Sequence, residues 1–100
     1  MAKKSMIERD KKRMKLYNKY KYKRENLLLK WKHKKTYNNR VDVQKSLEQL
    51  PRNSAKIRIR NRCWKTGRSH GFYRNFGICR HVLREMAHQG VIPGLIKASW

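Results

Sequence analysis

The sequence predicts a mostly α-helical chain with irregular segments: a long basic N-terminal helix, a linker, a short helix, and then a small zinc-ribbon-like hairpin and a C-terminal helix that lack the metal. Three observations predict this order. Residues 3–31 contain neither proline nor glycine and are rich in helix-forming residues. Two cysteines, each opening an incomplete Cys-x-x-Cys motif, bracket a segment rich in glycine and arginine. Residues 79–89 then place apolar side chains along one helical arc.

The expected N-terminal helix has no single apolar stripe. Ile7 and Met14 share a face, whereas Tyr20 and Leu27 lie nearly opposite. A helix of this kind has no broad face to bury. Two interpretations stay open, namely a basic helix laid against a binding partner and a disordered basic tail.

Residues 32–41 are polar and basic and predict a linker. Asp42 can cap a short helix in which Val43, Leu47 and Leu50 follow i, i+4, i+7 spacing, and Pro51 ends it. We therefore expect two domains: residues 1–50 form a basic helical extension and linker, and residues 51–100 form a compact core.

Residues 56–62 alternate strictly between cationic residues and others. As an extended segment they place Ile57 and Ile59 on one face and four cations on the other. Four like charges on one face repel each other unless an anion lies opposite. The alternation therefore predicts an extended segment that contacts phosphate through Lys56, Arg58, Arg60 and Arg62.

Cys63 and Cys79 each open a motif whose second cysteine is replaced, by Thr66 and Val82 respectively. Two complete motifs at this spacing would predict one tetrahedral zinc ion. Threonine is a very poor zinc ligand and valine cannot bind zinc, so we predict no metal and no cofactor. Zinc bound by the two thiols with His70 or His81 stays open as an alternative. A disulfide between the thiols is another alternative, although a reducing compartment favours free thiols.

Residues 79–89 give the strongest helix prediction. Its apolar arc adjoins a cationic arc of Arg80, Arg84 and His88 at i, i+4, i+8. Gly90 suits a left-handed C-terminal cap, and we expect the terminal Trp100 to fill a groove. The apolar side chains expected to hold the core are Ile57, Ile59, Trp64, Phe72, Phe76, Ile78, Leu83 and Met86.

The chain carries 28 lysine and arginine residues against 6 acids, a net charge of +22. This charge points to a polyanionic partner. Only 38% of the residues are hydrophobic, whereas ordering 100 residues costs on the order of 100–200 kcal/mol. We therefore expect much of the chain to order only when closely spaced phosphates neutralise it, with RNA as the favoured partner.

Other classes of protein fit poorly. The longest apolar run, Leu27–Leu29, is far too short to span a bilayer. Metal-dependent nucleases cluster carboxylates, and six acids in the whole chain do not favour an enzyme. A DNA-binding or architectural protein is the alternative on composition, but no clean recognition helix or dimer signal is evident. We expect no homo-oligomer.

The expected RNA contacts fall in two chemical classes. Basic side chains bind phosphate, and aromatic rings or His70 stack on unpaired bases. The predicted RNA-binding residues are Arg52, Lys56, Arg58, Arg60, Arg62, Trp64, Arg68, His70, Tyr73, Arg74, Arg80, Arg84, Lys97 and Trp100.

Several short segments together resemble one known family: Leu50–Ser54, Arg62-Cys63, Gly67-Arg68, Tyr73–Gly77, Arg80–Glu85 and Lys97–Trp100. In order and spacing they are similar to the fourteenth protein of the small ribosomal subunit, in its bacterial and plastid form. The resemblance covers the whole chain and is most specific in the C-terminal half. The family has a short form with four cysteines and zinc and a longer form without them, and this chain resembles the longer form.

The resemblance implies a structural constituent of the ribosome. It would bind the 3′ major domain of the small-subunit (16S-type) ribosomal RNA and help assemble the head of the small subunit. Its neighbours would be the head proteins numbered three, ten, thirteen and nineteen. The segments at Arg9–Arg13 and His81–His88 look especially like plastid and cyanobacterial members. We therefore expect a ribosome of the chloroplast stroma, with the bacterial cytoplasm as the alternative.

Overall fold

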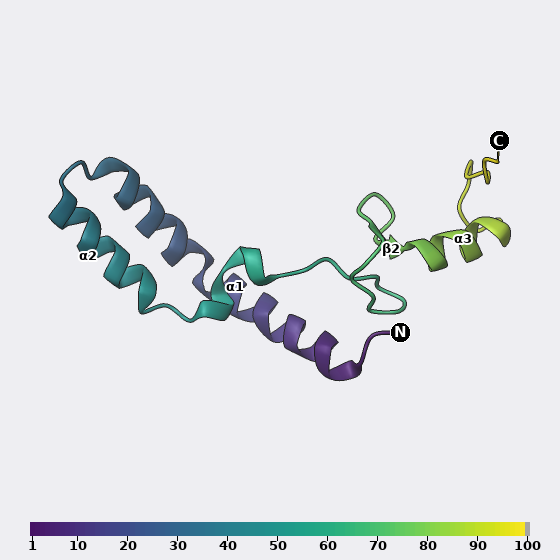
Figure 1. The fold of residues 1–100 in the computed structure, drawn as a ribbon, viewed down its shortest axis with the longest axis horizontal. Coiled ribbons are helices and arrows are strands. Elements are labelled where there is room, and N and C mark those ends of the chain that lie inside the picture. The colour runs from purple at the N-terminus through teal and green to yellow at the C-terminus, as the bar shows by residue number, and fades with distance from the viewer. Residues whose placement is uncertain (100) are drawn as a thin grey trace. The chain divides into compact units, whose positions relative to one another are not determined.

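The computed structural model describes residues 1–99 and confirms a mostly helical chain with a short two-stranded hairpin. The elements in order are α1 (Lys4–His33), α2 (Tyr37–Glu48), the 3₁₀ turns η1 (Arg52–Ser54) and η2 (Lys56–Arg58), β1 (Phe72–Tyr73), β2 (Ile78–Cys79) and α3 (Arg80–His88) (Figure 1). The chain forms two compact units. Residues 8–59 make up one unit, and residues 1–7 together with the chain from residue 60 onward make up the other.

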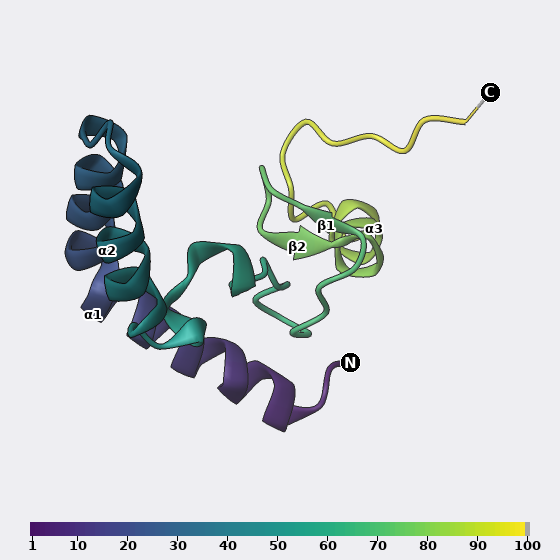
Figure 2. The same cartoon turned by 60° about the vertical axis from the view of Figure 1, so that its left-hand side comes forward.

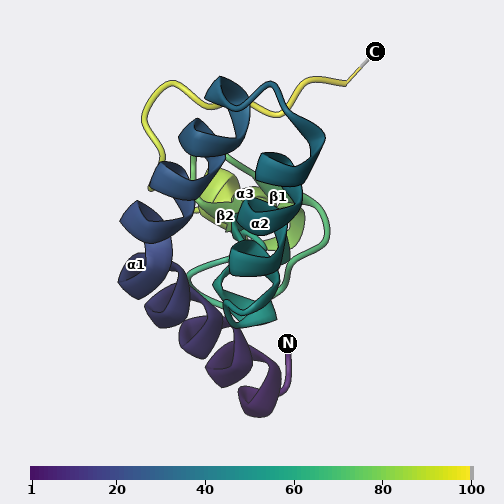
Figure 3. The same ribbon diagram turned by 90° about the vertical axis from the view of Figure 1, so that its left-hand side faces the viewer.

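In the unit of residues 8–59, the second half of α1 and α2 lie side by side as an antiparallel helical hairpin (Figures 1 and 3). The predicted N-terminal helix is confirmed. None of the apolar side chains of α1 is fully buried, as the missing apolar stripe predicts. On α2 and just beyond it, Val43 and Leu50 are buried, which confirms the apolar face expected for the short helix.

The connection between α1 and α2 corrects the predicted linker. It covers residues 34–36 instead of 32–41, because α1 continues to His33 and α2 begins at Tyr37. The predicted N-cap, Asp42, lies inside α2, and Thr36 occupies the N-cap position. Arg40 explains the short connection: its Nε donates to the Lys34 carbonyl at 2.8 Å, and its guanidinium lies 5.0 Å from the centre of the Trp31 ring. One side chain thus stabilises the end of α1 and the turn after it.

The predicted extended segment at residues 56–62 is wrong in its first half. Lys56–Arg58 form a 3₁₀ turn in which the Arg58 N–H donates to the Ala55 carbonyl at 3.2 Å. A lone extended segment leaves its backbone groups without a ladder partner, and the two strands in residues 1–99 lie elsewhere. The turn satisfies part of the backbone locally instead, and Ile57 is left 93% exposed.

In the other unit, β1 and β2 pair antiparallel with Phe72 opposite Cys79 and Tyr73 opposite Ile78. Figure 2 shows the two strands beside α3, which follows β2 directly. The predicted helix at 79–89 is confirmed within one residue at each end. Gly90, with φ of 67°, ends the helix in a Schellman motif. The Val91 N–H donates to the Met86 carbonyl and the Gly90 N–H donates to the Ala87 carbonyl, both at 3.1 Å.

The core of this unit consists of Cys63, Ile78, Cys79 and Val82. Leu83, Met86 and Ile92 pack against it and are partly buried. Three residues predicted for the core are exposed instead: Ile57, Trp64 at 70% and Phe76 at 43%. Trp64 and Phe76 lie in turns, after Cys63 and between β1 and β2, outside this small core. Ile57 lies in η2, in the other unit.

Candidate nucleic-acid interface

The four positions of the two incomplete cysteine motifs converge in the core. Cys63, Cys79 and Val82 are each about 2% exposed or less. The Thr66 hydroxyl lies 3.6 Å from the Cys79 sulfur. The tight turn after Cys63 is closed by two backbone hydrogen bonds, from Gly67 N–H to the Cys63 carbonyl at 2.8 Å and from Cys63 N–H to the Arg68 carbonyl at 2.9 Å. Both cysteines are free thiols, and no group of three metal-ligating side chains occurs among residues 1–99.

The Cys63 thiol is unusually acidic. Burial raises its pKa, but hydrogen bonds from the Thr66 hydroxyl and from the backbone N–H groups of Thr66, Cys79 and Lys65 outweigh burial and lower the pKa to about 7. The sulfur of Cys63 is therefore surrounded by N–H and O–H groups that favour negative charge.

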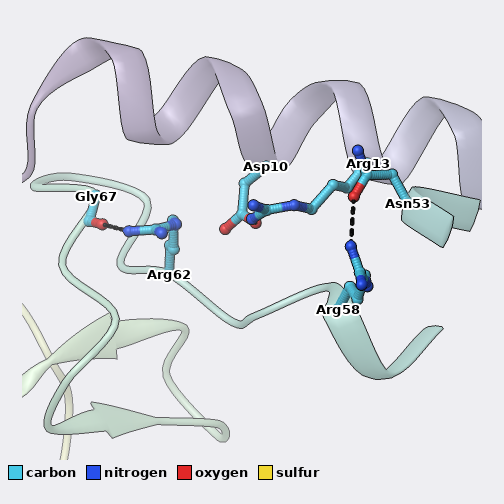
Figure 4. Close-up of polar contacts among 6 residues, drawn as sticks. All are labelled: Asp10, Arg13, Asn53, Arg58, Arg62 and Gly67. Atoms are coloured by element: carbon cyan, nitrogen blue, oxygen red, sulfur yellow. Dashed lines mark hydrogen bonds and ion pairs between the residues drawn. The ribbon is translucent and has the colours of Figure 1, made fainter. Parts of the chain in front are cut away.

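Predicted RNA-binding residues gather around the loop that begins at Arg60. Nη1 of Arg62 donates to the Gly67 carbonyl at 3.0 Å (Figure 4), and Nη2 of Arg60 lies 3.3 Å from Nδ1 of His70. Arg62, Arg68 and His70 line a cavity of about 270 Å³ together with the first residues of the chain. No acidic side chain lines this cavity. The loop thus presents several cationic or protonatable groups to one space.

The N-terminal residues were not predicted to take part in this site. The Ala2 N–H donates to the Thr66 carbonyl at 3.2 Å. Gly67, with φ of 72°, leaves room for Ile7, because a Cβ added at Gly67 would lie 2.5 Å from the Ile7 Cδ1. No local sequence pattern links residues 2 and 7 to residues 66 and 67, so sequence reasoning could not find this contact.

The cationic arc of α3 forms a second cluster. Tyr73, Arg80, Arg84 and Lys97, all predicted to bind RNA, line one cavity of about 230 Å³. The backbone of Arg80 is fixed by its N–H, which donates to the Gly71 carbonyl at 2.8 Å, and its aliphatic stem lies next to Gly71, where a side chain would approach it to 3.2 Å.

The remaining predicted residues are more dispersed. In the unit of residues 8–59, Arg52, Lys56 and Arg58 lie exposed on η1 and η2, and Nη1 of Arg58 donates to Oδ1 of Asn53 at 3.2 Å (Figure 4). In the other unit, Trp64 and Arg74 are exposed. Trp100, with its predicted groove contact, lies outside the described residues.

Arg24 is missing from the predicted set and has structural partners. It donates from Nε to the Ser54 hydroxyl at 2.9 Å and from Nη2 to the Pro51 carbonyl at 3.2 Å. Ser54 is fully buried, so Arg24 fixes η1 against α1. Pro51 and Ser54 lie 27 and 30 residues beyond Arg24 in the sequence. No signal in the sequence could therefore have distinguished Arg24 from its solvent-exposed neighbours.

The charge on these surfaces is largely unopposed. Six acids can neutralise at most six of the 28 positive charges. Some of these pairs are weak, such as Lys65 with Glu85 at 3.9 Å. None of the helices in the described part of the chain combines the length and apolar character needed to cross a bilayer. The arrangement suits an extended polyanion.

Comparison with known proteins agrees with this chemistry. The family described as ribosomal protein S14p/S29e matches residues 46–99. Over the full length of both chains, the protein is 61% identical to small ribosomal subunit protein uS14c of Trieres chinensis and 58% identical to uS14c of Phaeodactylum tricornutum. It is 56% identical, again over both full lengths, to small ribosomal subunit protein uS14 of Acaryochloris marina. The chain therefore belongs to the ribosomal protein S14p/S29e family, as a structural constituent of the small ribosomal subunit and not an enzyme.

Proposed function

We propose that this protein binds the 3′ major domain of the small-subunit ribosomal RNA and helps to assemble the head of the subunit. The observation that carries the proposal is the pair of acid-free cavities, each lined by several of the predicted RNA-binding side chains. Membership of a ribosomal family supports an RNA partner. RNA phosphates can neutralise a chain of +22 that its own six acids cannot.

The proposed contacts follow from how each group is held. The Arg62 side chain is restrained by its hydrogen bond to the Gly67 carbonyl, so it binds phosphate with less loss of side-chain entropy than a free arginine. Arg58 is restrained by Asn53 in the same way. The exposed rings of Trp64 and Tyr73 are available for stacking on unpaired bases. The other predicted contacts, including Trp100, are part of the same proposal.

We also propose a functional division of the chain. Residues 51–100 form the RNA-binding core, and residues 1–50 form an extension that becomes ordered between RNA and neighbouring proteins. The support is the exposed apolar surface of α1, where Met14, Leu28 and Leu29 are about half exposed. A chain with such a helix depends on partners for order. Circular dichroism without RNA should show less helix than the complex, whereas full helix content at low salt would contradict the division.

The hairpin and α3 are proposed to be a zinc ribbon that keeps its shape without zinc. Convergence of Cys63, Thr66, Cys79 and Val82 on one core supports this view. The double substitution Thr66→Cys and Val82→Cys should then create a site that binds one zinc ion per chain. Measurement of zinc in the purified protein tests it, with Thr66→Ser and Val82→Ile as the control pair. Zinc in the unaltered protein, or none in the double variant, would contradict the proposal.

The proposed neighbours are the head proteins numbered three, ten, thirteen and nineteen. The proposed location is the ribosome of the chloroplast stroma, with the bacterial cytoplasm as the alternative. Relatives named uS14c support the plastid location, and the cyanobacterial relative from Acaryochloris marina is compatible with the alternative.

The test is a binding competition with the full-length protein. The 3′ major domain fragment should bind more tightly than the 5′ or central domain fragments of the same RNA, and it should displace duplex DNA. Equal affinity for all RNA fragments would leave only charge attraction and contradict domain-specific binding. Preference for duplex DNA would favour the alternative of an architectural DNA-binding protein.

A further inference from the structure

The cavity beside α3 differs from the other cationic surfaces because much of its lining is apolar. Leu83 and Ala87 of α3 and Leu95 and Ile96 of the C-terminal tail contribute to its lining. Its volume of about 230 Å³ is below the roughly 300–1,000 Å³ of pockets that take larger ligands. A space of this size and character suits one flat, apolar-faced group and not an extended chain.

The tail reaches this cavity because α3 ends abruptly. The Schellman motif at Gly90 turns the chain away from the helix axis, and residues 95–97 then line the same space as α3. Ile96 remains 87% exposed and Tyr73 47% exposed. Both side chains are therefore accessible to a molecule that enters the cavity.

Three cationic side chains also line the cavity and are here called its cationic rim. Arg80 and Arg84 lie one helical turn apart on α3, Lys97 lies on the tail, and no acidic side chain lines the space. An apolar lining, an exposed aromatic ring and the cationic rim match the two ends of a nucleotide: the base is a flat π-surface and the phosphate is an anion. An acid-free cationic rim is less suited to the side chain of another basic ribosomal protein.

We propose that this cavity holds one unpaired nucleotide of the ribosomal RNA. Its base enters beside Tyr73 over Leu83 and Ala87, and its phosphate pairs with Arg80, Arg84 or Lys97. This inference rests on the proposed RNA-binding function and adds to it a defined subsite on α3. It assigns base contact to Tyr73 and phosphate contact to the cationic rim.

The test compares full-length variants bound to the 3′ major domain fragment, with chemical probing of each base. Tyr73→Leu removes the ring but keeps an apolar side chain, and Ala87→Phe fills the cavity. Tyr73→Phe keeps the ring, and Tyr37→Leu removes a more exposed tyrosine outside the cavity, 79% exposed on α2. The unaltered protein should protect one unpaired base, and Tyr73→Leu and Ala87→Phe should each abolish that protection.

The same two changes should weaken binding roughly 5- to 150-fold, the loss expected for one stacked base. Tyr37→Leu should leave affinity and protection unchanged, and Tyr73→Phe should retain the protection of the single base that Tyr73→Leu abolishes. Arg84→Gln should lower the slope of log affinity against log salt by about 1. Amide exchange of α3 in each variant shows whether the helix is intact. Because Arg84 is exposed, Arg84→Gln should not disturb the fold, so it tests the cationic rim even if another variant unfolds.

Unchanged protection and affinity in Tyr73→Leu would overturn the proposal while leaving RNA binding intact. Weaker binding without a change at any single base would also overturn it. Protection that depends on the cavity only when other ribosomal proteins are present would assign the cavity to a protein side chain instead. Failure of the unaltered protein to bind the fragment would instead reject the proposed function on which the inference rests.

Discussion

Substitution of Val82 by alanine tests the core that replaces a metal centre. Val82 is 2% exposed at the position where a fourth zinc-ligating cysteine would stand. Removing two methyl groups costs about 1.6 kcal/mol in burial, and the cavity left behind raises the cost to about 2–3 kcal/mol. The higher helix propensity of alanine returns about 0.5 kcal/mol. The net loss of stability should be about 1.5–2.5 kcal/mol.

Amide hydrogen exchange of α3 measures this loss directly, because it reports the free energy of opening at each residue. Exchange of the α3 amides should accelerate roughly 10- to 70-fold. Val91→Ala is the matched control, because Val91 is 58% exposed just after the same helix and should change stability by less than about 0.5 kcal/mol. Equal exchange in the two variants would refute the argument that Val82 is a packed core residue.

Three further predictions concern the N-terminal contact, the acidic thiol and the charge. Gly67→Ala should release the Ala2–Thr66 hydrogen bond and destabilise the protein by about 1–3 kcal/mol more than Gly90→Ala, as measured by amide exchange. Both glycines have positive φ, but of the two only Gly67 has a neighbour that an added Cβ would meet, the Ile7 Cδ1 at 2.5 Å. Equal destabilisation by the two substitutions would contradict the contact between Gly67 and Ile7. The pKa of Cys63 is lowered from 9.0 in the unfolded chain to about 7 in the fold, so its contribution to stability should grow between pH 7 and 9 and be lost as pH falls through 7. Because Cys63 is only 2% exposed, the ultraviolet absorbance of the thiolate measures its ionisation without a reagent. The difference in absorbance from Cys63→Ser should rise near pH 7 in the folded protein and near pH 9 in urea, and equal midpoints would refute the hydrogen-bonded thiolate. RNA affinity should fall with salt with a log–log slope of about −7 to −9, for roughly ten neutralised phosphates, and a flat response would rule out phosphate contact as the main source of affinity.

Helices that are determined by neighbouring residues could be predicted from local sequence patterns. The helix at Arg80–His88 follows from its apolar arc and from Gly90, which supplies the left-handed cap. The long helix α1 follows from residues that favour helix without interruption. These features depend on neighbours within about one turn, so the sequence alone predicts them.

Features set by distant contacts escaped prediction. The alternation at Ile57 and Ile59 suggested an extended segment, but a strand needs a partner strand, and none in residues 1–99 pairs with it. The start of α2 depends on Arg40 reaching back to Lys34 and Trp31. The roles of Arg24 and Ile7 depend on residues far away along the chain. Several predicted RNA-binding residues do gather around shared cavities, yet their contacts with RNA stay predictions.

The central claim is that this protein is an RNA-neutralised component of the small ribosomal subunit. Sedimentation of subunits from cells that express the tagged full-length chain tests it most directly. The protein should travel with the small subunit at low salt and leave it only at high salt, as expected when many phosphate contacts hold it. Sedimentation as a free, fully folded monomer at low salt, with no material in the small-subunit fractions, would contradict the claim.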